Sequence, residues 1–282
     1  IPAAASAASA ASAAALAEGA VSAAEEDSPA AVAAAVAAEP PGAGDEVRCG
    51  RFQAMLDDTG MVIVAGGSAR RFGGGNKLLI ELAGMPLFLH TVRRFLPELA
   101  GRIVVVVPRA ERETFRSAAD RFLPDHRLIW AEGGAVRSES VKSGLAALPD
   151  GVTIAAIHDA ARPLANLALL EKLVEKVRTT GGAIPGKPVT DTLKRTDSAG
   201  LICETVNRSG LWRVETPQVF RRAALEEAYR RAGDREFTDD AGVMEAAGFP
   251  VAMVHNEAEN LKLTYAGETE LLARLLEAEP RR

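Results

Sequence analysis

A chain of 282 residues with 48% apolar side chains can bury a core in one large domain or two smaller ones. Its net charge of −5 comes from the first 46 residues, which hold seven acids and no Lys or Arg, so the remainder has a net charge of +2. A near-neutral remainder excludes a broad basic surface for nucleic acid. Cys49 and Cys203 lie far apart without metal-ligand neighbours in the sequence, which favours a reducing compartment and a cytoplasmic protein.

Residues 1–58 are expected to be an alanine-rich, disordered leader, and residues 59–282 the folded domain. The first 46 residues are nearly half alanine, filled out with Ser, Pro, Gly and Glu. No run of Leu, Ile or Phe is dense enough for a membrane span, so we expect no membrane association. A secretory signal would have a basic start and a stronger apolar segment, and both are missing here. A transit peptide would be rich in Arg and poor in acids, whereas the first 46 residues hold no Arg and seven acids.

From residue 59 on, short apolar runs alternate with helical patterns. The runs at 61–65, 102–108 and 152–159 are continuously apolar, which is typical of strands buried on both faces of a sheet. Apolar side chains at helical spacing predict helices, which in chain order are 86–96, 110–122, 136–148, 167–180 and 223–233. This alternation predicts an α/β domain with a mostly parallel sheet flanked by helices.

Residues 187–214 interrupt the alternation. They are rich in Thr, Val and Arg, and turn-forming residues at 197–200 divide them into two halves. We therefore expect a β-arm of two strands. An isolated hairpin with few apolar side chains is marginal in water, so the arm should pack against another body, for example a second subunit.

The stretch "VAGGSARRFGGGNK" at 64–77 follows the first expected strand. Ligands in open α/β sheets bind beyond the carboxyl ends of the strands. The stretch fits neither the mononucleotide nor the dinucleotide phosphate-loop spacing. Instead, Arg70, Arg71 and Lys77 add full charges to a glycine-rich loop, which suits a triphosphate whose charge must be neutralised. The alternative is a glycine-rich surface loop with incidental cations.

Two further polar clusters stand out. "HDAAR" at 158–162 directly follows the strand expected at 152–157, and its Asp159 and Arg162 could contact substrate hydroxyls or assist a metal. Alternatively, Asp159 caps the next helix and His158 is a packed core histidine. In "NLKLT" at 260–264, Lys262 alternates with two leucines, as on one face of a strand, where a lone lysine is usually solvated.

Eight short motifs follow one another from about residue 60 to the C-terminus. They are "AGGSARRFGGGNK" (65–77), "GGAVRSES" (133–140), "HDAARP" (158–163), "DTLKR" (191–195), "NRSGLW" (207–212), "ETPQ" (215–218), "TDD" (238–240) and "NLKLT" (260–264). Each motif alone is weak, but eight in this order and spacing are highly specific. In these motifs the chain resembles the 2-C-methyl-D-erythritol 4-phosphate cytidylyltransferase family.

The resemblance implies a Rossmann-like domain, a homodimer in which the β-arm at about 187–214 crosses to the partner, and an activity that makes cytidine-diphospho-methylerythritol and pyrophosphate from CTP in isoprenoid precursor synthesis. It also implies roles for single residues. The CTP phosphates would be wrapped by Ala65, Gly66, Gly67 and Ser68, and the cytidine held by Gly134, Arg137 and Ser140. The reacting phosphates would be stabilised by Arg71, Lys77 and Lys262.

Methylerythritol phosphate would be contacted by Asp159, Arg162, Thr216 and Thr238, and by Thr192 and Arg208 reaching from the partner's arm. Mg²⁺, or another divalent cation, would bridge the triphosphate, with Asp159 as a candidate ligand. The chain departs from the family's usual residues at Ala69, Asn76, Ala135 and Asn207. None of these departures removes a cation, so they bear on loop conformation and nucleotide affinity more than on the reaction.

Two alternatives stay open from the sequence. One is a cytidylyltransferase for ribitol 5-phosphate, which has similar motifs, although "HDAARP" fits the methylerythritol group better. The other is a non-catalytic, nucleotide-binding dimeric protein. The retained Arg71, Lys77 and Lys262 argue against it, because a protein that only binds needs no such concentration of cations around one α-phosphate.

Overall fold

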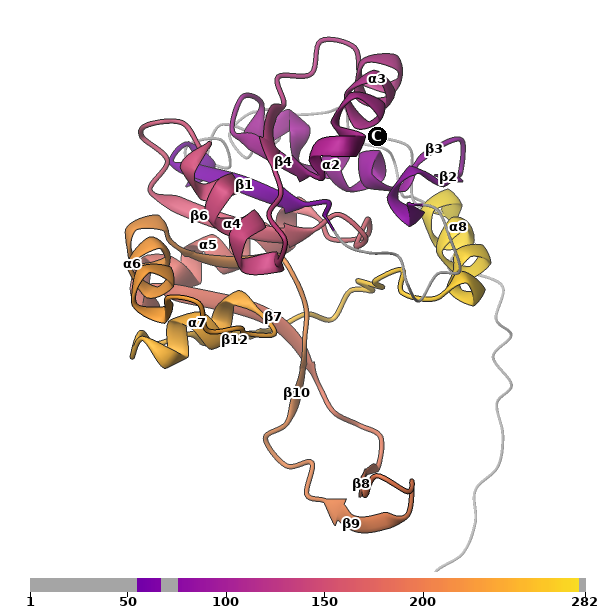
Figure 1. Cartoon of the computed structure of the whole chain (residues 1–282), viewed down its shortest axis with the longest axis vertical. Helices are drawn as coiled ribbons and strands as arrows, with labels where there is room; N and C mark the ends of the chain where they lie inside the picture. The colour runs from indigo at the N-terminus through magenta and orange to yellow at the C-terminus, as the bar shows by residue number, and fades with distance from the viewer. Residues whose placement is uncertain (1–54, 67–75, 279–282) are drawn as a thin grey trace, which may run out of the picture. The chain divides into compact units, whose positions relative to one another are not determined.

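The computed structural model describes residues 55–66 and 76–278, all within the compact unit Ala43–Arg282. Their main feature is an eight-stranded mixed sheet with the order β10-β7-β11-β6-β1-β4-β5, and β12 pairs with β7 (Figure 1). In chain order the strands of this sheet are β1 (Thr59–Val64), β4 (Ile103–Val107), β5 (Ile129–Glu132), β6 (Ile154–Asp159), β7 (Gly182–Pro188), β10 (Trp212–Val214), β11 (Gln218–Arg221) and β12 (Ala252–His255).

The centre of the sheet is parallel. β6, β1, β4 and β5 run in one direction, and the register pairs Val64 of β1 with both Asp159 of β6 and Val106 of β4. These strands therefore end level with one another, which brings the residues that follow them to one edge. β11 is antiparallel to β6 and β7. The prediction of a mostly parallel α/β sheet is confirmed, and the three expected strands are β1, β4 and β6.

Helices cover both faces of the sheet. They are α2 (Leu87–Leu99), α3 (Arg112–Phe122), α4 (Arg137–Ala146), α5 (Leu167–Thr180), α6 (Arg222–Ala232), α7 (Asp240–Ala246) and α8 (Thr269–Ala278). Short 3-10 helices are η2 (Lys77–Leu79), η3 (Arg109–Glu111) and η4 (Ala266–Glu268), and β2 (Glu81–Leu82) pairs with β3 (Met85–Pro86). The five helices expected from the sequence are present as α2 to α6. Among the described helices, none is long and apolar enough to cross a membrane.

The period of two along β1 explains why its apolar run is continuous. Met61 and Ile63 belong to a core formed with α2, α3 and α5, whereas Val62 and Val64 belong to a second core with α4, α6 and α7. Because successive side chains point to opposite faces, a strand covered on both faces must be apolar at every position. The first core also contains Leu56, so packed structure begins before the boundary expected at residue 59.

The arm expected at 187–214 grows out of the main sheet. β7 and β10 pair antiparallel at its base, and β8 (Leu193–Thr196) pairs only with β9 (Ile202–Val206) at its tip (Figure 1). The turn between them is closed by Asp197, whose carboxylate accepts hydrogen bonds from the backbone N–H groups of Ala199 and Leu201. The prediction of a two-stranded hairpin is confirmed.

The prediction of a strand at 260–264 was wrong. These residues form no ladder, because β6 already pairs with β1 on one side and β11 on the other. A backbone–backbone hydrogen bond, from the N–H of Leu263 to the carbonyl of Ala161, ties the segment to the chain beyond β6. Its alternation is real nevertheless, since Leu263 is buried and Lys262 is exposed.

We expect Gly144→Ala to destabilise the fold, although Ala is the better helix former. A Cβ at Gly144 would lie 2.3 Å from Val62 Cγ1 and 2.9 Å from Val106 Cγ2, where α4 packs on the sheet. Overpacking of this kind costs about 1–3 kcal/mol, which should appear as a lower free energy of unfolding in urea titrations. Ser143→Ala, one residue earlier on α4, is the matched control. Equal stability of the two variants would contradict the expected close approach.

Candidate active site

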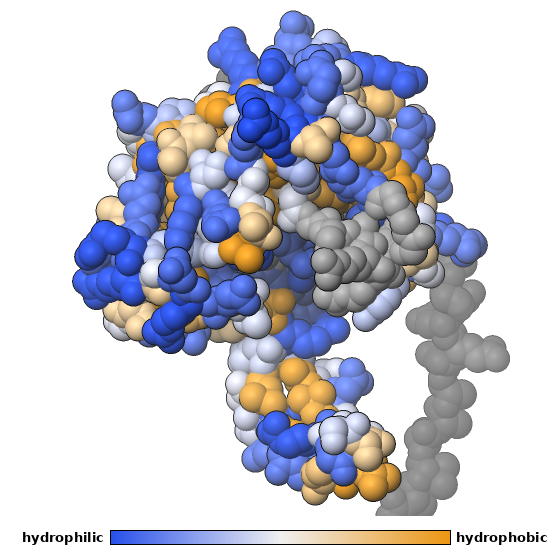
Figure 2. Space-filling model, viewed as in Figure 1, coloured by the Kyte–Doolittle hydropathy of each residue, from blue (hydrophilic) through white to orange (hydrophobic). Residues whose placement is uncertain are grey.

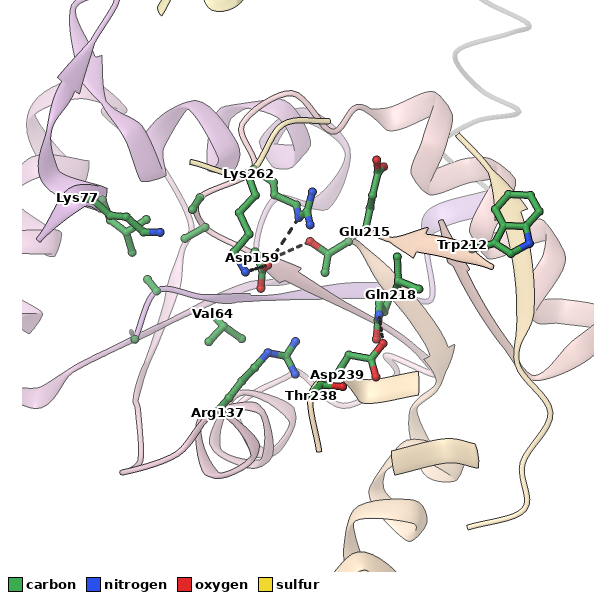
Figure 3. A pocket seen from close by; sticks show the side chains of 18 residues that line it. Val64, Lys77, Arg137, Asp159, Trp212, Glu215, Gln218, Thr238, Asp239 and Lys262 are labelled. Atoms are coloured by element: carbon green, nitrogen blue, oxygen red, sulfur yellow. Dashed lines mark hydrogen bonds and ion pairs between the residues drawn. The ribbon is translucent and has the colours of Figure 1, made fainter. Parts of the chain in front are cut away.

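A cavity of about 580 Å³ lies beyond the C-terminal ends of β1 and β6 (Figure 3). Its walls come from η2, the start of α4, the junction between β10 and β11, the residues before α7, and the segment around Lys262. Among the described residues, four cationic side chains line it, and three carboxylates lie among them. The ends of parallel strands have thus gathered charged groups from segments that are distant in sequence.

Asp159 lies among three of these cations, Lys262, Arg162 and Arg137. It is the last residue of β6, and its Oδ2 accepts a hydrogen bond from Lys262 Nζ at 2.7 Å and lies 3.7 Å from Arg162 Nε. Burial by itself would raise the pKa of Asp159, but the ion pair with Lys262 and the charges of Arg137 and Arg162 outweigh it and lower the pKa to about 2. Asp159 is therefore a permanent anion at neutral pH.

His158, next to Asp159, is a core histidine with a fixed tautomer. Its Nε2 lies 3.2 Å from the carbonyl oxygen of Arg162, which can only accept, so Nε2 carries the proton. Nδ1 then accepts from the hydroxyl of Thr216 at 2.9 Å, and that hydroxyl accepts from the backbone N–H of Asp159. Burial lowers the pKa of His158 to about 4, so the ring is neutral at pH 7. The interpretation of His158 as a packed histidine fits this geometry.

A second carboxylate fixes a cation on the other side of the cavity. Arg137, the first residue of α4, donates from Nη2 to Oδ2 of Asp240 at 2.6 Å. Burial would lower the pKa of Arg137, but Asp240 outweighs it and raises the pKa, so the guanidinium stays charged. Figure 3 shows Arg137 reaching from α4 toward the middle of the cavity, beside Thr238 and Asp239.

Glu215 and Asn260 anchor the segment that carries Lys262. The Nδ2 of Asn260 donates to Glu215 Oε2 at 3.1 Å and to the carbonyl of Thr216 at 2.8 Å. The backbone carbonyl of Asn260 accepts in turn from Arg162 Nη1 at 2.7 Å. Since the segment has no strand partner, these bonds take the place of a ladder and hold Lys262 over Asp159.

Lys77 enters the cavity from η2. Asn76 caps this short helix by accepting a hydrogen bond from the backbone N–H of Leu78 at 3.0 Å, and its Nδ2 donates to Glu111. Lys77 Nζ donates to the backbone carbonyl of Leu263 at 2.5 Å. The asparagine at 76, which departs from the family's usual proline, thus supplies a side-chain cap that proline lacks. Lys77 is thus hydrogen-bonded to the same C-terminal segment that carries Lys262.

The structure brings most of the predicted site residues together. Those that line the cavity are Ala65, Gly66, Lys77, Arg137, Asp159, Arg162, Thr216, Thr238 and Lys262. Ser140 and Gly134 lie beside it, hydrogen-bonded to each other at 3.2 Å. Gly67, Ser68 and Arg71 fall outside the described residues, as do Arg70 and Ala69. The roles assigned to all these residues stay predictions.

Thr192 and Arg208 lie apart from the cavity, on the arm. Arg208 Nη1 donates to the backbone carbonyl of Thr190 and both residues are exposed. Sequence reasoning missed the polar and aromatic cavity residues Trp212, Glu215, Gln218 and Asp239, besides several aliphatic ones. All four stand inside the motifs "NRSGLW", "ETPQ" and "TDD", so the motifs marked them although no role had been assigned.

The arrangement suits phosphate chemistry, because cations held in place can neutralise the negative charge of phosphate groups. Among the described residues, no three His, Cys, Asp or Glu side chains gather as a ready metal site. Mg²⁺ does not need one, because it is commonly held by one or two carboxylates together with the phosphates of a substrate. Asp159, ionised and lining the cavity, is the residue that fits this mode.

Comparison with known proteins gives a consistent result. The sequence model of the family described as 2-C-methyl-D-erythritol 4-phosphate cytidylyltransferase matches residues 59–276. A protein of that name from Bacillus licheniformis is 37% identical over 225 residues, which cover 78% of this chain and 96% of that protein. The crystal structure of the protein of that name from Thermus thermophilus aligns with a TM-score of 0.66 at 28% identity, over 78% of this chain and all of the other.

Longer proteins match equally well. The bifunctional enzyme IspD/IspF of Rhodospirillum rubrum is 40% identical over 222 residues, covering 77% of this chain but only 57% of that protein. The one from Rhizobium rhizogenes is 39% identical, and 53% of it is covered. The chain therefore spans little more than half the length of these relatives and nearly the full length of the monofunctional one.

We expect His158 to make the stability of the fold depend on pH. Its folded pKa of about 4 lies below the ordinary value of 6.5, so the unfolded chain binds the extra proton between these values. The stability present above pH 6.5 should fall as the pH drops toward 4, by about 3 kcal/mol in all, since one pKa unit corresponds to about 1.4 kcal/mol. Urea titrations at several pH values would measure this fall.

His158→Asn is the control for this measurement. An asparagine can still accept from the Thr216 hydroxyl but does not titrate. The variant should therefore lose less stability than the wild type between pH 7 and 5, whatever its stability at pH 7. Parallel curves for the two proteins would contradict the assignment of the effect to His158.

Proposed function

The chain belongs to the 2-C-methyl-D-erythritol 4-phosphate cytidylyltransferase family, and from that premise we propose that it transfers CMP from CTP to 2-C-methyl-D-erythritol 4-phosphate, releasing pyrophosphate. The observation that carries this proposal is the cavity lined by Lys77, Arg137, Arg162 and Lys262, in which the last three surround Asp159. We further propose that this reaction serves the non-mevalonate route to isoprenoid precursors. A cytoplasmic location stays a prediction from the sequence.

The proposed reaction joins two anions. A phosphate oxygen of the sugar-alcohol phosphate attacks the α-phosphorus of CTP, and the bond to the β-phosphate oxygen breaks. A terminal phosphate carries about −1.5 to −2 at neutral pH, so its oxygen is already a nucleophile and no general base is required. The remaining obstacles are repulsion between the reactants and their orientation. Lysine and arginine side chains fixed before the reaction address both.

The Lys262–Asp159 ion pair lies where the phosphates would bind. In the described structure Lys262 donates to Asp159, and its side chain remains 43% exposed. We propose that the phosphates draw Lys262 away from Asp159, whose carboxylate then helps to hold Mg²⁺. The ion would supply charge neutralisation at the triphosphate. Asp159 would remain paired with Arg162, so the released carboxylate is not left without a cation.

We also propose that two chains form a homodimer through their arms. The tip of the arm exposes 67% of Leu201 and 65% of Ile202, and apolar surface gathers there in Figure 2. A two-stranded hairpin of this kind is marginal in isolation, and a partner would cover these side chains. Thr192 and Arg208 are exposed on the arm, so in the dimer they would be available to the substrate in the partner's cavity.

Two other functions remain to be tested against this one. A ribitol-5-phosphate cytidylyltransferase would use the same nucleotide chemistry with a different acceptor. A non-catalytic nucleotide-binding dimer would bind CTP and release no pyrophosphate. The positions of Lys77 and Lys262 support catalysis, because segments distant in the sequence bring two positive charges into one cavity, where they can stabilise the reacting phosphates.

A panel of acceptors tests the function directly. The protein is incubated with CTP, Mg²⁺ and either methylerythritol 4-phosphate, ribitol 5-phosphate or glycerol 3-phosphate, and pyrophosphate release is measured. We expect kcat/KM to be highest by far with methylerythritol 4-phosphate. A preference for ribitol 5-phosphate would favour the first alternative, and CTP binding without release with any acceptor would favour the second.

Lys77→Ala and Lys262→Ala should each lower kcat by about 100-fold or more, because each removes a positive charge that stabilises the phosphates in the transition state. Steady-state pyrophosphate release measures the effect. Lys172→Ala is the matched control, since Lys172 is exposed on α5 and lies outside the cavity. Turnover close to the wild-type value in either cavity variant would contradict the proposed roles.

A further inference from the structure

Asp240 is a fully buried carboxylate that lies behind the cavity without lining it. It is 0% exposed, and both of its oxygens accept short hydrogen bonds, Oδ2 from Arg137 Nη2 and Oδ1 from the hydroxyl of Tyr229, each at 2.6 Å. Its backbone N–H donates to Gln218 Oε1 at 3.0 Å. Of these partners, Arg137 and Gln218 line the cavity. Arg137 is the one that bonds to the carboxylate itself, whereas Gln218 bonds to the backbone N–H, so an effect of the Asp240 carboxylate on a ligand would pass through Arg137.

The helix that carries Arg137 does not stabilise its positive charge. It is the first residue of α4, and the N-terminal end of a helix carries a partial positive charge that disfavours cations. Val136, at the N-cap, makes no side-chain hydrogen bond. The acid of the first turn, Glu139, accepts instead from the backbone N–H of Ala135 at 2.6 Å. The carboxylate that fixes the guanidinium comes from another helix, α7.

The position of α7 is itself determined by the sheet. Gln218, the first residue of β11, accepts from the backbone N–H groups of Asp240 and Ala241 at 3.0 Å, and its Nε2 donates to Asp239 at 2.9 Å. Tyr229, on α6, holds the second oxygen of Asp240, and burial with the nearby carboxylate raises the pKa of Tyr229, so it remains a donor. Asp240 is therefore held independently of Arg137.

We propose that Asp240, backed by Tyr229, is a positioning residue that holds the guanidinium of Arg137 in the orientation in which it binds the nucleotide. The inference rests on the proposed function, because it takes CTP as the ligand. An arginine has five N–H donors, and the bond to Asp240 engages Nη2, so donors remain for a ligand in the cavity. Without the carboxylate, the flexible side chain would sample many orientations and bind the nucleotide less tightly.

A double-mutant cycle on CTP binding tests the proposal. The dissociation constant of Mg·CTP is measured by calorimetry for the wild type, Asp240→Asn, Arg137→Met and the double variant. Asp240→Asn should weaken binding about tenfold, the scale of one charge-assisted hydrogen bond. In the Arg137→Met background the same substitution should change the dissociation constant little, because the group that Asp240 positions is gone.

Thermal stability separates positioning from a purely structural role. Arg137→Met leaves a buried carboxylate without its cation and should lower Tm, and Asp240→Asn should raise Tm again in that background. Tyr229→Phe tests the same network while keeping the Asp240 carboxylate. Because it removes the hydroxyl that donates to Asp240 Oδ1, we expect it to weaken CTP binding about threefold. Glu245→Gln, which removes an exposed carboxylate from the same helix, is the matched control and should leave the dissociation constant unchanged.

The outcomes distinguish this inference from the proposed function. Unchanged CTP binding in Asp240→Asn, or an equal loss with and without Arg137, would overturn the positioning role even if the wild type releases pyrophosphate normally. A coupled loss of CTP binding in a protein that transfers no CMP would support the positioning role and reject the proposed function. A wild-type protein that does not bind CTP would overturn both.

Discussion

A single ionised carboxylate at the end of a buried strand organises the candidate site. Asp159 emerges from β6, where burial alone would favour its neutral form, and it stays charged because three cations surround it. Those cations come from three places: Arg162 from the turn after β6, Arg137 from α4, and Lys262 from the C-terminal segment. An anion in this position stabilises the clustered cations. In the proposed function, the pair between Lys262 and Asp159 is the one that a phosphate ligand would rearrange.

The two sides of the cavity use different kinds of carboxylate. Asp159 lines the cavity and pairs with the exposed Lys262, so that pair can exchange with a ligand. Asp240 is fully enclosed, and its bonds to Arg137 and Tyr229 leave no oxygen for a ligand. Desolvated pairs keep their geometry because breaking them leaves a buried charge, whereas exposed pairs contribute little and exchange readily. This difference suits the proposed reaction. The enclosed pair of Asp240 and Arg137 would keep a fixed orientation for the nucleotide, and the exposed pair of Asp159 and Lys262 would give way to the second anion.

The antiparallel strand β11 connects these sides. It lies between β6 and β7, so "ETPQ" stands at the edge where β6 ends, with Glu215 and Thr216 facing the Lys262 segment and Gln218 facing α7. The arm leaves the sheet from β7 and returns through β10, directly before this motif. Movement of the arm would therefore be felt at Trp212 and Glu215, which line the cavity.

The sequence by itself determined the α/β class, the strands β1, β4 and β6, five helices and the two-stranded arm, because each has a strong local pattern. It also marked most residues of the cavity, because they stand in short motifs that can be recognised without knowing the fold. It did not determine β7, β11, β12 or α7, which are short or contain Gly and Pro and acquire their form from neighbouring elements. The tertiary structure decided that 260–264 is not a strand, because both edges of β6 are occupied. It also decided the partners of Arg137 and Lys262, which are each 103 residues away in the chain, since long-range pairing of charges depends on packing and leaves no local pattern.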